Sequence, residues 1–283
     1  ANADIELRGA NAVARWTHTL GPKSSFTVQS YFDYTHRVLP GSITEHLGIF
    51  DLDVQHRLPV GDAYDFIWGA GYRTMNDRVV NPANLAFYPA NVKRDWFSGF
   101  VQAERMFLED RIRLTVGAKV ERNPYSGTEI QPSIRAVWKV RERQRFWGAI
   151  SRAVHTPSRI DRDLSQPGPG GLLVLLEGNR NFESETVLAY ELGYRAQPTP
   201  KLQTSLSAFY NDYDHVRSTT TNSTLDGFGL PFPFFFQNNL KGKTYGFELS
   251  ASYQLLDWWR LHGGYDLLKE DIEIKPGKFD INN

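Results

Sequence analysis

The sequence predicts an all-β fold: a transmembrane antiparallel β-barrel of about 12 long up-and-down strands. Hydrophobic and polar residues alternate with a period of two in segment after segment, as in strands with two unlike faces. The segments exceed the roughly 5–6 residues of common soluble strands and match the roughly 9–11 that cross a bilayer at a tilt. Short and mostly longer connections also alternate along the chain, which is typical of outer-membrane barrels.

The expected strands follow one another along the whole chain. They lie near residues 4–19, 24–36, 45–58, 64–74, 94–107, 111–121, 129–140, 144–154, 184–196, 201–214, 241–255 and 258–272. Short turns are expected at 21–23, 59–63, 108–110, 141–143, 198–200 and 256–257. The long connections exceed the usual length and are therefore the first places to look for function. They lie roughly at 75–93, 155–183 and 215–240.

The alternation also predicts which side chains face lipid. In residues 244–255 large apolar side chains occupy every second position, and the intervening positions, such as Glu248, are small or polar. Residues 184–196 repeat the pattern, with Arg195 on the polar side. We expect lipid contact for Leu188, Tyr190, Leu192, Tyr194, Tyr245, Phe247, Leu249, Tyr253, Trp259, Leu261 and Tyr265.

Composition excludes several classes of protein. The 283 residues include 32 basic and 32 acidic side chains, a balance that argues against binding nucleic acid through bulk positive charge. The absence of cysteine removes disulfide frameworks, thiolate metal sites and thiol nucleophiles. No run approaches the roughly 18 apolar residues of a membrane helix. The first residues lack the pattern of a signal peptide, which we expect to be upstream or removed.

The sequence contains few signals for chemistry. Its seven histidines are scattered without metal-ligand spacing, and no local motif joins a serine to a histidine. We therefore expect no catalytic residues and no cofactor. Asp212 and Asp214 end a strand and are weak candidates for calcium, because the glycine and terminal acid of a calcium loop are absent.

The long connection at 155–183 contains the main ligand-binding candidates. Mixed charges surround the apolar stretch Leu172–Leu176. Such residues either grip an anionic or amphiphilic ligand or fold the loop onto itself, and the sequence leaves both roles open. The candidates are His155, Arg159, Asp161, Arg162 and Arg180. Phenylalanines at 228, 232 and 234–236 are expected to support their loop or anchor it at the lipid headgroups.

Four stretches of the chain carry a resemblance to a known family. They are SRAVHTPSRIDRDL at 151–164, GNRNFESETVLAYELGYRAQ at 178–197, AFYNDYDHVRS at 208–218 and NNLKGKTYGFELSASYQLLDWWRLHGGYDLL at 238–268. Their order and wording resemble the barrel of TonB-dependent receptors, the outer-membrane active transporters of Gram-negative bacteria. The likeness is specific from about 145 to 270 and diffuse before that. The chain has His155 where the family pattern has arginine and Arg180 where it has proline, so both departures bear on ligand preference.

The resemblance implies a transport mechanism and its partners. Receptors of this kind bind a ferric siderophore, haem, cobalamin or a glycan on their outer loops, and a plug domain moves when the TonB energy-coupling complex pulls on it. A ferric siderophore or related iron complex is the expected ligand, and outer-membrane lipid surrounds the wall. The family barrel has about 22 strands. Residues 1–283 are therefore expected to be a partial barrel domain, without the plug or the C-terminal strands.

Two other hypotheses compete with that of a receptor. An even number of strands could close alone as a complete outer-membrane enzyme of the phospholipase or protease type, which would need a nucleophile held by a histidine or an acidic pair. A soluble adhesin or sandwich is disfavoured by the strand lengths and by the sorting of the loops.

Overall fold

In a computed structural model, residues 4–61, 63–171, 173–221 and 233–281 are described. The long strands are β1 (Glu6–Gly21), β2 (Ser24–Leu39), β3 (Ile43–Val60), β4 (Tyr64–Val80), β6 (Asn91–Phe107), β7 (Ile112–Asn123), β8 (Gly127–Arg141), β9 (Gln144–His155), β12 (Glu185–Thr199), β13 (Leu202–Thr221), β14 (Phe234–Leu256) and β15 (Trp259–Ile274). The short elements are β5 (Ala86–Phe87), α1 (Arg159–Asp163), β10 (Leu164–Pro167), the 3-10 turn η1 (Pro169–Gly171) and β11 (Val174–Glu177). No helix of the described residues is long and apolar enough to cross a membrane.

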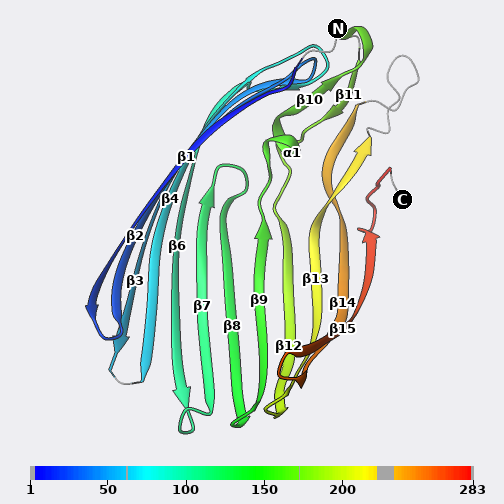
Figure 1. Cartoon of the computed structure of the whole chain (residues 1–283). Helices are drawn as coiled ribbons and strands as arrows, with labels where there is room; N and C mark the ends of the chain where they lie inside the picture. Colours follow the sequence, from blue (N-terminus) through cyan, green and yellow to red (C-terminus); the bar gives the residue numbers. More distant parts are fainter. Residues whose placement is uncertain (1–3, 62, 172, 222–232, 282–283) are drawn as a thin grey trace.

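The long strands form one antiparallel sheet in which each strand pairs with its neighbours in the sequence. They stand side by side as a curved wall, with β1 and β15 at its two free edges (Figure 1). The predicted all-β barrel wall of long up-and-down strands is confirmed, although the sheet in this chain is open. Each predicted strand is present, with ends that move by a few residues.

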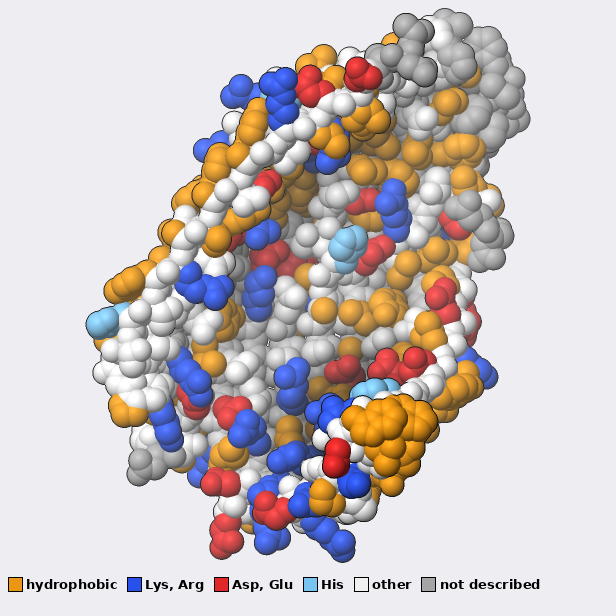
Figure 2. Space-filling view, in the orientation of Figure 1, with side chains coloured by type: hydrophobic (Ala, Val, Ile, Leu, Met, Phe, Trp, Pro, Cys, Tyr) orange, Lys and Arg blue, Asp and Glu red, His pale blue; other side chains and the backbone are white. Residues whose placement is uncertain are grey.

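The register keeps apolar side chains on a common face across the strands. Leu192 pairs with Gly148 and Ala208, and Phe247 pairs with Ala208 and Leu267. Because directly paired residues share a face, the side chains predicted to face lipid lie together on one side of the wall. Exposed examples are Leu192 at 69% and Tyr265 at 58%. The opposite, hollowed face carries many charged side chains (Figure 2). Contact with lipid itself stays a prediction.

The connections at the two ends of the wall differ. At one end the connections are tight turns in the residues that the structure describes, as predicted. At the other end β4 runs to Val80 and β13 to Thr221, further than expected, so two of the three long connections are shorter than predicted. The third spans 156–184, close to the predicted 155–183. Residues 40–42 and 124–126 at this end are also short turns, so the sorting of loop lengths is incomplete. Phe228 and Phe232 lie outside the described residues.

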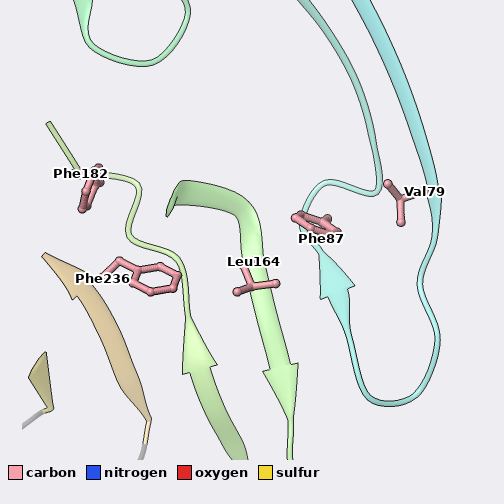
Figure 3. Close-up of a cluster of buried hydrophobic side chains, with 5 residues drawn as sticks. All are labelled: Val79, Phe87, Leu164, Phe182 and Phe236. Carbon is pink, nitrogen blue, oxygen red and sulfur yellow. The ribbon is translucent and has the colours of Figure 1, made fainter. Parts of the chain in front are cut away.

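Two of the connections and the start of β14 assemble into a small second layer at this end. β10 pairs with β5 and with β11, and β11 pairs in parallel with the first residues of β14. We call residues 81–90, 156–171 and 173–184 the cap. Its apolar centre consists of Val79, Phe87, Leu164, Phe182 and Phe236, all less than 10% exposed (Figure 3). Phe236 thus supports the loop, one of the two roles expected for the phenylalanines.

Candidate functional site

Helix α1 begins with its own hydrogen-bonded cap. The Ser158 backbone N–H donates to Asp161 Oδ2 over 2.8 Å, and the Ser158 hydroxyl accepts from the Asp161 backbone N–H over 3.3 Å. This reciprocal pair satisfies the first free N–H groups of a helix. The helix has only five residues, so it needs tertiary contacts to persist.

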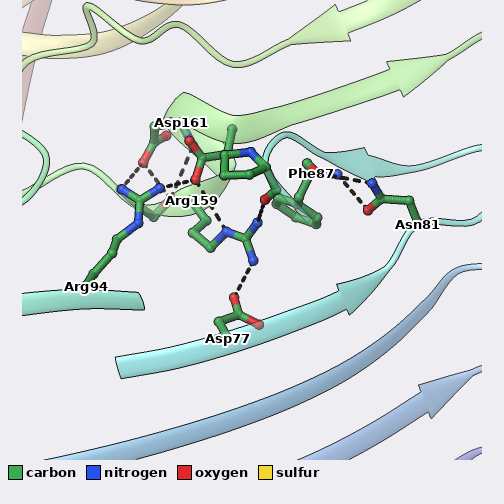
Figure 4. A network of polar contacts seen from close by, with 9 residues as sticks. Asp77, Asn81, Phe87, Arg94, Arg159 and Asp161 are labelled. Carbon is green, nitrogen blue, oxygen red and sulfur yellow. Dashed lines mark hydrogen bonds and ion pairs between the residues drawn. The ribbon is translucent and has the colours of Figure 1, made fainter. Parts of the chain in front are cut away.

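Arg159 supplies the largest set of those contacts (Figure 4). Its Nη1 lies 2.6 Å from Asp77 Oδ2 on β4, and its Nε lies 3.4 Å from Asp163 Oδ2. Its Nη2 donates to the carbonyl of Pro89, and the guanidinium lies 4.8 Å from the centre of the Phe87 ring. The residue is only 8% exposed. One arginine therefore joins α1 to β4 and to the connection between β4 and β6.

Two further arginines hold α1 from other strands. Arg94 on β6 donates to Asp163 Oδ2 and lies 4.2 Å from the centre of the Tyr125 ring. Arg217 on β13 lies 3.2 Å from Asp161 Oδ1 and 3.9 Å from the centre of the Phe236 ring. Two of the predicted ligand residues, Arg159 and Asp161, are thus buried in internal ion pairs. The structure gives them the second role that the sequence left open, which is to fold the loop.

A cavity of about 390 Å³ lies beside α1 and is surrounded by basic side chains. Arg152, Arg162, Arg180 and His215 line it, and the carboxylates that line it belong to Glu129 and Glu183. We call it the arginine pocket. It brings together two of the residues predicted from the sequence, Arg162 and Arg180, which lie 18 positions apart in the sequence.

The three arginines of the pocket differ in how strongly they are held. Arg152 lies 3.6 Å from Glu129 Oε2, and Arg162 donates to the carbonyl of Tyr125. Burial, and then repulsion from Arg94, lowers the pKa of the Arg162 guanidinium, which nevertheless stays charged at neutral pH. Arg180 is exposed and forms no ion pair with any described residue. It is therefore the arginine most available to a ligand.

His155 does not line the arginine pocket. Its side chain is 77% exposed, and its Nδ1 lies 3.0 Å from Glu185 Oε2 at the start of β12. His215, which the sequence did not single out, lines the pocket instead, with Nε2 3.1 Å from Glu183 Oε2. It has a positive φ of 59° where the register of β13 shifts, and such bulges re-aim side chains. No sequence pattern marks this bulge.

The two weak calcium candidates have other neighbours. Asp214 Oδ1 lies 2.6 Å from Lys275 Nζ, and Asp214 Oδ2 lies 3.3 Å from His215 Nδ1. Asp212 pairs across the sheet with Lys243. Within the described ranges, no group of three or more histidine, aspartate or glutamate side chains could hold a metal ion.

Comparison with known proteins identifies the wall. Residues 2–282 match the family model described as "TonB dependent receptor-like, beta-barrel". The chain belongs to this family. Membership places the TonB-dependent receptor wall in the outer membrane of a Gram-negative bacterium, and receptors of this family are transporters rather than enzymes. The resemblance seen in the sequence is therefore confirmed over nearly the whole chain.

The relatives include iron receptors. An iron-regulated outer membrane virulence protein of Vibrio cholerae is 23% identical over 215 residues, which cover 74% of this chain and 32% of that protein. The siderophore receptor PirA of Pseudomonas aeruginosa has a TM-score of 0.75 at 17% identity, covering 94% of this chain and 50% of PirA. The iron transporter FrpB of Neisseria meningitidis has a TM-score of 0.73 at 13% identity, covering 97% and 46%. The structural similarities show the fold. The chain covers about half the length of the two receptors of known structure and about a third of the Vibrio cholerae protein.

Proposed function

We propose that the full-length receptor takes up a scarce iron complex, most simply a ferric siderophore, and that the arginine pocket contacts the ligand. Transport is energised by the TonB system acting on a plug domain. The edges of β1 and β15 pair with further strands of the same barrel, because unpaired backbone groups are costly in lipid.

The charge of the pocket carries the proposal. Arg152, Arg162 and Arg180 converge on one cavity beside the cap, and two glutamates only partly balance them. Guanidinium groups bind carboxylates and similar planar anions through paired hydrogen bonds. The names of the relatives, an iron-regulated outer membrane protein and a siderophore receptor, support iron as the cargo.

No comparable observation supports the alternative hypothesis, a barrel enzyme. A serine nucleophile needs a histidine within hydrogen-bond distance. The two serines that line the arginine pocket bond to each other, Ser184 Oγ to Ser126 Oγ at 2.7 Å, and His215 contacts carboxylates. Among the residues that the structure describes, no serine hydroxyl is bonded to a histidine ring.

A binding measurement on the full-length receptor tests the pocket. Arg180→Gln removes the guanidinium that has no described ion pair. Affinity for an anionic ferric tricatecholate should fall about tenfold, because one charge-assisted hydrogen bond is worth about 1.5 kcal/mol. Arg162→Gln should weaken binding in the same direction. Titration followed by tryptophan fluorescence measures both.

The matched control is Arg143→Gln, at the exposed turn between β8 and β9 at the opposite end of the wall. This variant should bind the complex as the unmodified receptor does. Equal affinities for all three variants would remove the arginine pocket from ligand binding. Failure of the receptor to bind any ferric complex would reject iron transport.

A further inference from the structure

A row of basic side chains crosses the first four strands on the apolar face of the wall. Arg8 pairs with His36, His36 with His46, and His46 with Arg78. Directly paired residues share a face and have Cβ atoms about 5 Å apart. The same face carries Phe32, 46% exposed, further along β2. We call the four paired residues the basic row.

The basic row lies at one border of the apolar band. At the other border, Phe26, His56 and Trp68 form edge-to-face ring contacts of 5.9–6.0 Å. His46 and His56 are ten residues apart on β3, which corresponds to about 33 Å along a strand and about 25 Å along the normal at a tilt of about 40°. An outer-membrane barrel has an apolar band about 25 Å tall. The basic row therefore lies at the level of the headgroups, on the side of the cap.

The protein itself balances only part of this charge. Glu6 lies 2.7 Å from Arg8 and 3.8 Å from His36. Arg78 and the nearby Lys93 are in no ion pair with any residue that the structure describes. The His36 and His46 rings stack at 4.2 Å between centres, and His36 Nδ1 is buried without a hydrogen-bond partner in the described parts of the chain.

The corresponding face of the last strands is built differently. Asp212, Lys243 and Asp271 follow one another across β13, β14 and β15 in direct pairing. Their charges alternate in sign and compensate one another, so this part of the wall needs no external anion. The positive excess is thus a local property of β1 to β4.

We propose that the basic row binds the phosphate groups of a phosphorylated lipid in the outer leaflet. Arg78 and Lys93 carry positive charge that no described carboxylate pairs with, and a phosphate group beside them would neutralise it. The arginine fork matches phosphate oxygens, and the level of the row is that of lipid headgroups. The proposal depends on the membrane position of the wall and is independent of the transported ligand.

Native mass spectrometry of the full-length receptor in detergent tests the proposal, with lipid A carrying two phosphates as the probe. The double variant Arg8→Gln, Arg78→Gln should bind this lipid about 30-fold more weakly, since each basic residue near an anionic surface contributes about fivefold. Dephosphorylated lipid A should bind the unmodified receptor weakly. Lys243→Gln, in the compensated row, should bind lipid A without change.

Three results would overturn the proposal: unchanged binding by the double variant, equal binding of the dephosphorylated lipid, or displacement of the lipid by millimolar inorganic phosphate. The last would show a site for free anions. Should the double variant fail to fold, Arg78→Gln alone must still lose about fivefold in affinity. Loss of ferric complex binding would leave this outcome unaffected, because the two sites share no residue and lie on different strands.

Discussion

Arg159 shows how a single side chain can organise an outer loop. Its guanidinium contacts Asp77, Asp163 and the Pro89 carbonyl while it is almost completely buried. Removing one partner from such a network leaves the others as unpaired buried charges, which costs about 3–5 kcal/mol. We therefore expect Arg159→Gln to loosen the cap without unfolding the wall. Hydrogen exchange of residues 156–184 in the full-length receptor should accelerate strongly.

Arg180→Gln is the matched comparison for Arg159. Arg180 is exposed and supports no described contact, so the same amides should keep their protection in this variant while ligand affinity falls. If both variants accelerate exchange equally, the division between supporting and ligand-contacting arginines is wrong.

Sequence reasoning located the proposed arginine pocket only in part. It selected Arg162 and Arg180 because charges surround an apolar stretch in an unusually long connection. The same pattern selected Arg159 and Asp161, because the sequence cannot show whether a charged side chain has a buried partner 82 residues away, as Arg159 has in Asp77. His215 was missed because its direction depends on a bulge.

Within the wall, Gly193 on β12 allows a large aromatic side chain to cross it. A Cβ atom at this position would lie 2.2 Å from the Trp147 ring, which belongs to the directly paired residue of β9. Gly193→Val should therefore displace the ring and destabilise the barrel by about 1–3 kcal/mol. Urea unfolding of the full-length receptor measures the loss. Gly263→Ala on β15 should be tolerated, since a Cβ there meets no atom within 4 Å, and similar losses in both would contradict the packing explanation.

Adjacent residues on β14 test which face meets lipid. Leu249 pairs with Leu206 and Tyr265 on the apolar face, and Glu248 is on the hollowed face, within 3.5 Å of Ser207 Oγ. Leu249→Arg near the midplane should cost about 2–4 kcal/mol, and Glu248→Lys should cost much less. Unfolding from lipid vesicles gives both values. Equal damage would show that the assignment of the faces is wrong.

The strands could be predicted because their alternation runs for many residues, while the cap could not. β5, β10 and β11 have two to four residues each, too few to show a period. Their pairing also joins distant parts of the chain, such as Phe87 with Leu164. The extra length of β14 was missed because its first residues, FFF, do not alternate.

At the scale of the whole molecule, the wall, the cap and the basic row have different proposed roles in an outer-membrane receptor. The apolar face is expected to lie in the membrane, with the basic row proposed to hold lipid phosphates, and the hollowed face carries many charged side chains (Figure 2). The cap holds the proposed arginine pocket beside the mouth of the wall. The proposed function requires that these parts work within a complete barrel and plug.

Uptake of radioactive iron tests the central claim most directly. The full-length receptor should be expressed in a Gram-negative strain that lacks its own siderophore receptors, with and without a functional TonB protein, and supplied with a panel of ferric complexes. We predict accumulation of at least one anionic ferric complex, abolished by loss of TonB and reduced by Arg180→Gln. Accumulation of none of the complexes, or equal accumulation without TonB, would contradict the account.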